Sequence, residues 1–380
     1  MSKTYGVGIL GAGNISAAYL RLAPLFKGLE VRAVADIMPA AAQKRADEFN
    51  VAAQTPDELL KNSEIDVIVN LTVPAAHYQV SMDIVSAGKH SYSEKPFVLS
   101  LEEGEALKKA AETNNVAVGS APDTFLGGAH QQARDIIDSG KLGTIMSGTT
   151  HVMSRGMEHW HPNPDFFFQV GAGPILDIGP YYVTDLIHLI GPVKRVTAFT
   201  NMARAEREIT TPDSPLKGTM IKVGTPTTIH GVLEFHNGAI VTIGTSWDVA
   251  SHGHNNIELY GTEGSIYVPD PNFFGGDLTI TDIAGTKQKV TPWDHPFGVA
   301  NQDLDKDVPR ANYRTAGLAD MIAAVDAGRP ARCGLDVALH AVDVMTSLLK
   351  AGETGQVMTL TTTCERPAAL DPAAARALMK

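Results

Sequence analysis

A pair of glycines at the end of an apolar segment constrains the fold of this chain more than any other feature of its sequence. The segment at residues 4–10, TYGVGIL, leads directly into GAGNIS, where one residue separates Gly11 from Gly13. The third position of the pattern is Ser16, and Asp36 ends the next apolar segment. Gly11 allows a tight turn, Gly13 lets a pyrophosphate approach backbone N–H groups at a helix N-terminus, and Ser16 permits close helix–strand contact. The pattern predicts a dinucleotide-binding loop.

The N-terminal third of the chain alternates between apolar runs and helical patterns, which predicts a parallel sheet covered by helices on both faces. Thr55 followed by Pro56 marks the start of one helix, and Ser100 with Glu103 marks the start of another. The predicted strands lie at residues 4–10, 29–36, 66–73, 89–94 and 116–119. We therefore expect an α/β domain at residues 1–122.

The chain changes character after residue 122, where longer strand-like runs replace the alternation. HNG at 236–238 and GTEG at 261–264 predict turns between neighbouring strands. In the run at 241–247, alternate residues fall on opposite sides, which predicts a mainly antiparallel sheet with one face packed and one face open or covered by another subunit. Two domains also suit a chain of 380 residues, because single cores stop growing at roughly 250–300 residues.

Charge and composition exclude several classes of protein. The formal net charge of −11 at pH 7 argues against a nucleic-acid-binding surface, because such surfaces are usually basic. No apolar run approaches the roughly 20 residues that cross a bilayer, and the N-terminus lacks the pattern of a signal peptide. Cys333 and Cys364 have no metal-site or disulfide spacing, so we expect a cytoplasmic protein without a metal, although buried thiols are also compatible with secretion.

Asp36 predicts which cofactor the glycine loop binds. Its carboxylate would accept hydrogen bonds from the adenosine ribose and repel a 2′-phosphate, and the three residues after it include no arginine. We therefore expect NAD rather than NADP. Ligands of open parallel sheets bind beyond the carboxyl ends of the strands. The predicted cofactor contacts are Gly11, Gly13, Asn14, Ile15, Asp36, Thr72, Val73, Pro74, His77, Glu94 and Lys95. For His77, a loop position without a role in binding is an equally good explanation.

Lys95 follows the strand-like run at 89–94, at the edge of the sheet where a nicotinamide ring would lie. Pro96 restricts the backbone and so fixes the direction of the lysine. An ammonium beside an oxidised nicotinamide meets a second positive charge, so we expect the pKa of Lys95 to fall. The alternative is a surface lysine after a strand, which this placement makes the poorer explanation.

These segments, in this order, resemble the glucose–fructose oxidoreductase/inositol dehydrogenase (Gfo/Idh/MocA) family. The matching segments are GAGNIS, Asp36, GKHSYSEKPF and GPILDIGPYYVTDLIHLIGPV, and EKP is the most specific of them. The resemblance covers nearly the whole chain. It implies an N-terminal Rossmann domain at 1–122 and a C-terminal α/β domain at 123–380 with a large, mainly antiparallel open sheet. It also implies oxidation or reduction of a carbinol on a sugar, polyol or related compound with NAD(H) or NADP(H).

The resemblance gives roles to three residues. Lys95 matches the signature lysine, which binds the reacting oxygen and takes part in proton transfer. Asp177 matches the aspartate that opens the second motif. Tyr181 stands where inositol dehydrogenases carry a catalytic histidine, whereas relatives of glucose–fructose oxidoreductase and the dihydrodiol dehydrogenases carry a tyrosine. This departure makes Tyr181 the expected base.

A tyrosine with its usual pKa near 10 is a poor base until a cation stabilises the phenolate, and Lys95 is the expected cation. Tyr181, assisted by Lys95, would then remove the alcohol proton while a hydride passes to the nicotinamide. Asp177, one helical turn earlier, would orient the lysine or bond a neighbouring substrate hydroxyl. Taken alone, the aspartate and the tyrosine are better explained by a helix start and by packing, and the presence of Lys95 makes a functional role the better explanation.

A loop at residues 154–173 is rich in aromatic and imidazole groups. Its tryptophan would stack on a pyranose and its polar groups would bond hydroxyls, and packing against an interface is an equally good explanation. The loop residues concerned are His159, Trp160, His161 and Asn163. The side chain of Asp185 would either reach the substrate pocket or form a hydrogen bond with the backbone. The predicted substrate contacts are Lys95, Trp160, His161, Asp177, Tyr181 and Asp185.

Three functions are compatible with these residues. The leading one is an NAD-dependent dehydrogenase for a sugar, a polyol or a sugar derivative, associated as a homodimer or homotetramer through the C-terminal sheet. A glycosidase of the same scaffold would use NAD⁺ to oxidise its sugar transiently and so permit elimination. A sensor that binds NAD and a sugar and regulates a partner would not need Lys95 and Tyr181 together, so their joint presence argues against it.

Overall fold

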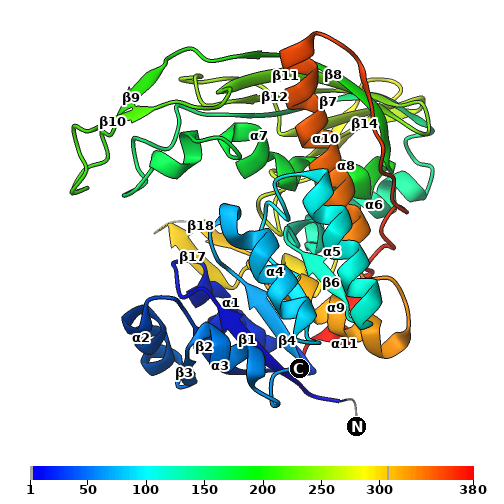
Figure 1. Ribbon diagram of the computed structural model, residues 1–380. Helices are drawn as coiled ribbons and strands as arrows, with labels where there is room; N and C mark the ends of the chain where they lie inside the picture. The colour runs from blue at the N-terminus through cyan, green and yellow to red at the C-terminus, as the bar shows by residue number, and fades with distance from the viewer. Residues whose placement is uncertain (1–2, 306–307) are drawn as a thin grey trace.

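The first domain is built on a parallel sheet of six strands in the order β3-β2-β1-β4-β5-β6 (Figure 1). A computed structural model describes residues 3–305 and 308–380. The strands are β1 (Tyr5–Leu10), β2 (Leu29–Ala35), β3 (Ala52–Gln54), β4 (Val67–Asn70), β5 (His90–Ser93) and β6 (Val118–Ser120). All neighbouring pairs run parallel, which confirms the prediction from the alternating pattern. The edge strand β3 was not predicted, because its three residues are not buried and carry no apolar run.

Helices cover both faces of this sheet. They are α1 (Ser16–Leu22), α2 (Pro39–Phe49), α3 (Pro56–Lys61), α4 (His77–Ser86) and α5 (Leu101–Asn114). α3 begins with a reciprocal cap, in which the Thr55 side chain accepts from the Glu58 N–H and the Glu58 carboxylate accepts from the Thr55 N–H at 2.8 Å. α5 begins after Ser100, whose hydroxyl accepts from the Glu103 N–H at 3.2 Å. Both predicted helix starts are confirmed.

The second domain contains a nine-stranded sheet in the order β16-β15-β14-β13-β7-β12-β11-β8-β19. Its strands are β7 (Ile145–Met153), β8 (Val193–Asn201), β11 (Thr228–Phe235), β12 (Ile240–Ser246), β13 (Ile257–Gly261), β14 (Gly264–Val268), β15 (Thr279–Asp282), β16 (Lys287–Lys289) and β19 (Met358–Thr359). β12 and β7 pair in parallel, and the other neighbours are antiparallel. The turn at HNG joins β11 to β12 and the turn at GTEG joins β13 to β14, as predicted.

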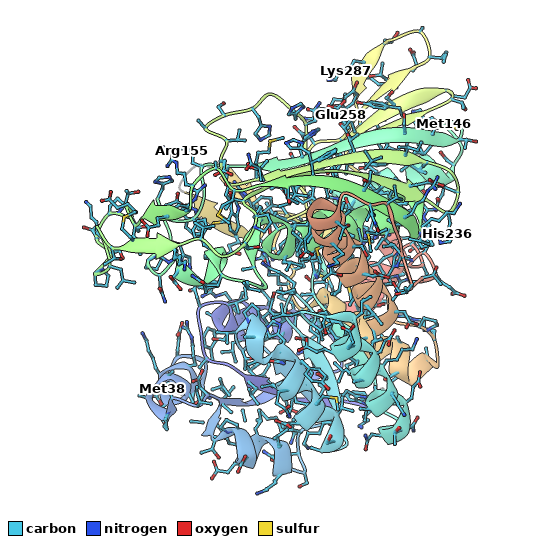
Figure 2. All side chains as sticks on the ribbon, turned by 45° about the horizontal axis from the view of Figure 1, so that its top comes forward. Met38, Met146, Arg155, His236, Glu258 and Lys287 are labelled. Atoms are coloured by element: carbon cyan, nitrogen blue, oxygen red, sulfur yellow. The ribbon has the colours of Figure 1, made fainter. Side chains whose placement is uncertain are left out.

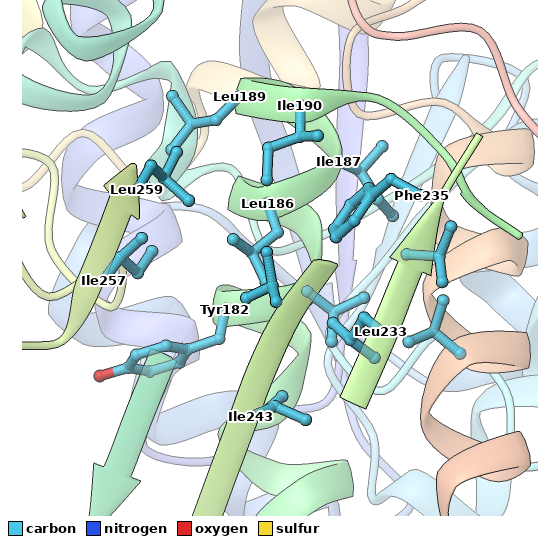
Figure 3. Packing of buried hydrophobic residues seen from close by; sticks show 14 of the residues in the cluster. Tyr182, Leu186, Ile187, Leu189, Ile190, Leu233, Phe235, Ile243, Ile257 and Leu259 are labelled. Carbon is cyan, nitrogen blue, oxygen red and sulfur yellow. The ribbon is translucent and has the colours of Figure 1, made fainter. Parts of the chain in front are cut away.

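One face of the second sheet packs on α8 (Gly179–Ile190), and the other face is open. Figure 3 shows Leu186 and Ile187 of α8 close to Leu233 and Ile243 of the sheet. On the opposite face, Figure 2 shows Glu258 and Lys287 directed away from the first domain. In β12 exposed and buried residues alternate over Ile240–Ile243, whereas Gly244, Thr245 and Ser246 are all buried, so the predicted alternation holds only for the first half of the strand.

Smaller elements complete the second domain and its borders. They are α6 (Gly128–Asp138), α7 (Gly173–Asp177), the pair β9 (Glu206–Glu208) and β10 (Met220–Lys222), and the pair β17 (Gln302–Asp305) and β18 (Val308–Arg310). The β9–β10 pair projects from the end of the large sheet (Figure 1). None of the described helices is long and apolar enough to cross a bilayer.

The end of the chain returns to the first domain through α9 (Ala316–Ala327), α10 (Leu335–Thr354) and α11 (Pro372–Leu378). Residues of α9 and α11 belong to the same core as β1. The long helix α10 contributes Val342 to the core under α5 and Leu348 to the core under the second sheet (Figure 1). α10 therefore ties the two domains together, and the boundary at residue 122 stays a prediction about where the chain leaves the first sheet.

Candidate active site

The glycine loop after β1 has the shape that a dinucleotide requires. Gly11 has a φ of +108°, and a Cβ there would lie 2.6 Å from the Leu71 carbonyl oxygen, so only glycine fits. A Cβ on Gly13 would meet no atom within 4 Å, so the space beside this residue is open to a ligand. The Asp36 carboxylate accepts from the backbone N–H groups of Ala12 at 2.7 Å and Met38 at 2.8 Å. A carboxylate is thus held beside the open loop, and these residues fit a pyrophosphate and a ribose.

Asn14 and Ile15 continue the loop into α1. Within the described part of the chain, their backbone N–H groups have no acceptor, which leaves both donors available to a phosphate. A feature that was not predicted is Arg45 of α2, whose guanidinium donates to the Gly13 carbonyl oxygen at 3.3 Å and pairs with Glu48. An arginine therefore reaches the loop from α2, although none directly follows Asp36.

The loop after β4 carries the next group of predicted contacts. Thr72 bonds the Asn70 side chain at 2.7 Å, Val73 is 67% exposed, and Pro74 begins a short 3-10 turn. His77 is fully buried, and its ring nitrogens lie 2.9 Å from the Thr72 carbonyl oxygen and 2.7 Å from that of Pro96. His77 braces the loops after β4 and β5 against each other, and this position presents no ring atom to a cofactor.

Glu94 lies at the end of β5, and both of its carboxylate oxygens accept a hydrogen bond. It accepts from the Tyr19 hydroxyl at 3.0 Å and from the backbone N–H of Lys95 at 3.0 Å. The first contact joins β5 to α1, which follows the glycine loop. Glu94 therefore fixes the position of the backbone at Lys95 relative to that loop.

Lys95 joins the two domains. Its Nζ donates to Asp177 Oδ1 at 2.7 Å and to the Asp177 carbonyl oxygen at 2.6 Å, and it lies 5.4 Å from the centre of the Tyr181 ring. Burial by itself would lower the pKa of Lys95, but the charge of Asp177 and its hydrogen bond outweigh burial and raise it. Lys95 is therefore a protonated cation in the protein without cofactor, and the lowering of its pKa beside an oxidised nicotinamide stays a prediction.

The segment that carries Asp177 and Tyr181 is not one helix. α7 ends at Asp177, Ile178 follows, and α8 begins at Gly179 with Pro180 as its second residue. Proline suits this position because the first helical N–H groups have no partner within the helix. The expected single helical turn between Asp177 and Tyr181 is therefore wrong, and the break frees the Asp177 carbonyl oxygen to accept from Lys95.

The sequence did not single out two residues that meet beside the end of the first sheet, namely Arg314 and Asp123. Tyr181 is 8% exposed; burial acts to lower the pKa of Arg314, and electrostatic interaction with Tyr181 is the largest effect that raises it. Asp123 is buried at the start of α9, where it accepts from the backbone N–H groups of Thr315 and Gly317, each at 3.0 Å. Asp123 follows β6 directly, and the segment that carries Arg314 returns to it from the second domain.

The aromatic loop divides into a packed part and an exposed part. Phe167 and Phe168 pack with Trp247 and with residues of the β9–β10 pair. Trp160 is 61% exposed and lies edge-on to His161. The hydroxyl of Thr210 lies 2.6 Å from the ring nitrogen Nδ1 of His159. Asn163 donates its backbone N–H to His161.

Asp185 lies apart from the lysine. Its side chain is fully buried and pairs with His130 Nδ1 at 2.9 Å, an arrangement that supports α6 against α8. The prediction that Asp185 contacts a substrate has no support in this position. Within residues 3–305 and 308–380, no group of three His, Cys, Asp or Glu side chains is placed to hold a metal ion.

A hollow of about 760 Å³ lies elsewhere on the protein. It is bounded by α9, the start of α10 and the segment at 364–368, and Lys95, Asp177 and Tyr181 do not line it. The chemistry-bearing residues instead lie along the junction between the domains, between the carboxyl end of the parallel sheet and the start of α8. We therefore assign the site from the contacts of these side chains.

A Rossmann sheet, an open glycine loop and a lysine–aspartate pair define this protein as a two-domain NAD-binding oxidoreductase. The chain matches two models of one family, namely "Oxidoreductase family, NAD-binding Rossmann fold" over residues 5–121 and "GFO/IDH/MocA C-terminal domain" over residues 130–267. The chain belongs to the Gfo/Idh/MocA family of oxidoreductases, a family that contains sugar and polyol dehydrogenases.

Similar proteins include a levoglucosan dehydrogenase of Pseudarthrobacter phenanthrenivorans, which is 27% identical over 70% of this chain and 73% of its own length. An uncharacterized oxidoreductase of Schizosaccharomyces pombe is 29% identical over 50% of this chain, and the match spans 53% of that protein. Among solved structures, levoglucosan dehydrogenase in complex with NADH and L-sorbose has a TM-score of 0.79 and 20% identity, covering 95% of this chain and 100% of that one. This structural likeness supports the fold.

Asp123 gives a prediction for stability against pH. Burial raises the pKa of Asp123 from 3.8 to about 6, so between these values the folded protein keeps a proton that the unfolded chain releases. The stabilisation from this proton is complete below the unfolded pKa and is lost as the pH rises through the folded pKa. Asp123→Asn keeps an acceptor oxygen for both N–H groups and does not titrate. Urea unfolding should show that wild type loses about 3 kcal/mol relative to Asp123→Asn between roughly pH 4 and pH 7. A difference that does not change with pH would contradict the assignment.

Proposed function

We propose that this protein is an NAD-dependent dehydrogenase that transfers a hydride between nicotinamide and a carbinol or carbonyl of a sugar, polyol or sugar derivative. The observation that carries the proposal is the Lys95–Asp177 pair over the face of Tyr181, at the junction between the domains. Relatives named for levoglucosan and inositol support the substrate class.

The proposed chemistry follows from the contacts of Lys95. Two of its three N–H donors go to Asp177, which leaves one for the reacting oxygen of a substrate. Bound nicotinamide would supply the hydride acceptor or donor. Tyr181 takes the hydroxyl proton during oxidation and returns it during reduction. Asp177 keeps the ammonium charged and aimed at the site.

The preference for NAD over NADP is part of the proposal. Asp36 places a negative charge beside the open glycine loop, where it would repel a 2′-phosphate. Arg45 argues against this preference, because its guanidinium also reaches the loop and could attract a 2′-phosphate. Its pairing with Glu48 reduces the positive charge available for that attraction. A cytoplasmic location is also proposed, since both cysteines are free and disulfides are rare in reducing compartments.

The function is tested by screening polyols, aldoses and anhydrosugars with NAD⁺ and with NADP⁺. The absorbance of the reduced cofactor measures turnover in each reaction. We expect NAD⁺ reduction with at least one compound, and a kcat lower by about 10²–10⁴-fold in Lys95→Met, because the oxygen ligand and the charge beside Tyr181 are lost. Lys108→Met is the matched control, since Lys108 pairs with Asp336 on the surface.

The outcomes of the screen separate the candidate functions. Equal or faster turnover with NADP⁺ would contradict the argument from Asp36. Release of a leaving group without net NADH would indicate the glycosidase reaction. Unchanged turnover in Lys95→Met would contradict the mechanism, and NADH binding to this variant shows that it is folded.

We also propose that a second copy of the chain covers the open face of the second sheet. Phe199 of β8 is 82% exposed and lies opposite His230 of β11 on this face. Light scattering should give the mass of a dimer or tetramer of the 40.4 kDa chain, and Phe199→Glu should weaken the assembly. Ile283→Glu, at a residue 74% exposed in the turn after β15, is the control. A monomeric wild-type protein would contradict this proposal.

A further inference from the structure

Arg45 of α2 contacts the glycine loop and is at the same time paired with a carboxylate. Its Nη2 lies 3.3 Å from the Gly13 carbonyl oxygen, and its Nη1 lies 2.5 Å from Glu48 Oε2. The Arg45 side chain is mostly buried, at 17% exposure, whereas that of Glu48 is 41% exposed. Because the contact to Gly13 is long for a hydrogen bond and the ion pair is short, Glu48 is the stronger restraint on the guanidinium.

Two opposite charges reach neighbouring residues of this loop. Asp36 accepts from the Ala12 N–H at 2.7 Å, and Arg45 donates to the carbonyl oxygen of the next residue, Gly13. In the part of the chain that the structure describes, Asp36 and Arg45 form no ion pair with each other. The Asp36 oxygens accept from backbone N–H groups instead, and the guanidinium pairs with Glu48. Asp36 therefore keeps its full negative charge beside the loop.

A 2′-phosphate placed beside Asp36 needs a cation to offset the charge of that carboxylate. Arg45 has the right chemistry, since a guanidinium binds phosphate oxygens in pairs and stays charged. Glu48 opposes such binding in two ways. Its negative charge offsets that of Arg45, and its carboxylate occupies a donor that a phosphate would use. A 2′-phosphate would therefore have to displace Glu48 from Arg45.

We propose that Glu48 is a positioning residue for cofactor selection: it holds Arg45 away from a 2′-phosphate, so that Asp36 and Glu48 together produce the preference for NAD. The inference rests on the proposed preference for NAD over NADP. Asp36 acts directly, by repulsion at the ribose, and Glu48 acts through Arg45. Ion pairs of this spacing on a helix contribute little to stability, so the main effect of removing Glu48 is on the charge at the loop.

The test compares the binding of NADPH and NADH to the full-length protein by the fluorescence of the reduced nicotinamide, and it needs no substrate. The measured quantity is the ratio of the two dissociation constants, NADPH over NADH, in which effects common to both nucleotides cancel. Glu48→Gln should lower this ratio by about fivefold, the effect of one unit charge a few ångströms away in water. The change should shrink as salt is added, because exposed charges are screened. NADH should remain the tighter ligand, because Asp36 is still present.

Further variants show whether Glu48 acts through Arg45. Glu48→Asp keeps the negative charge, so its ratio should lie closer to wild type than that of Glu48→Gln. The double variant Arg45→Met/Glu48→Gln should lose the effect, because the guanidinium is absent. Glu64→Gln is the matched control, since Glu64 also pairs with an arginine, Arg32, at 3.4 Å. Glu64 lies beside Gly6 at the start of β1, whereas the glycine loop follows the end of this strand.

The outcomes separate this proposal from the proposed function. An unchanged ratio in Glu48→Gln would contradict the proposal. An equal fall of the ratio in the double variant would also contradict it, because Glu48 would then act without Arg45. A wild-type protein that binds neither nucleotide would overturn the proposed function and this inference together. Tight binding of NADH without turnover of any compound would contradict the dehydrogenase reaction alone, and the ratio would still decide the role of Glu48.

Discussion

The ion pair between Lys95 and Asp177 is the contact on which the site depends. Lys95 comes from the end of a parallel strand in the first domain and Asp177 from the end of a short helix in the second. Both side chains are mostly withdrawn from water, at 16% and 15% exposure. Removing one partner of such a pair leaves a charge without compensation, which costs far more than the pair gains. The contact between the two domains at this site therefore depends on both charges being present.

Each charged side chain around this pair makes a different contact. Glu94, in the first domain, fixes the backbone of Lys95, and Asp177, in the second domain, holds its ammonium group. Arg314 approaches Tyr181 from the returning segment, which Asp123 anchors. Two cations and a phenol thus meet where two domains and the end of the chain converge. Such an arrangement holds charges in fixed positions at the place where a proton is proposed to move. The charges do not depend on flexible side chains at the surface.

Much of this organisation was predictable because it is local. Gly11 is required by its own φ and by the adjacent Leu71 carbonyl, and the cap at Thr55 involves neighbours in sequence. The break between α7 and α8 was visible as Pro180, although its consequence for the Asp177 carbonyl was not. Arg314 and Asp123 could not be found in this way. Asp123 and Gly317 are 194 residues apart in sequence, and only the return of α9 to the first sheet brings them together. The contact of Lys95 with Asp177, 82 residues away, was one of the two roles expected for Asp177, but its effect of raising the pKa of Lys95 was not predicted.

The most direct test of the account is a crystal structure with NADH and the most active substrate or product from the screen. We predict that the reacting oxygen lies about 2.6–3.2 Å from both Lys95 Nζ and the Tyr181 hydroxyl oxygen, with the carbon that bears it facing the nicotinamide. Asp177 should still accept from Lys95 in this complex. A substrate oxygen bound elsewhere, with Lys95 and Tyr181 turned away from it, would contradict the account.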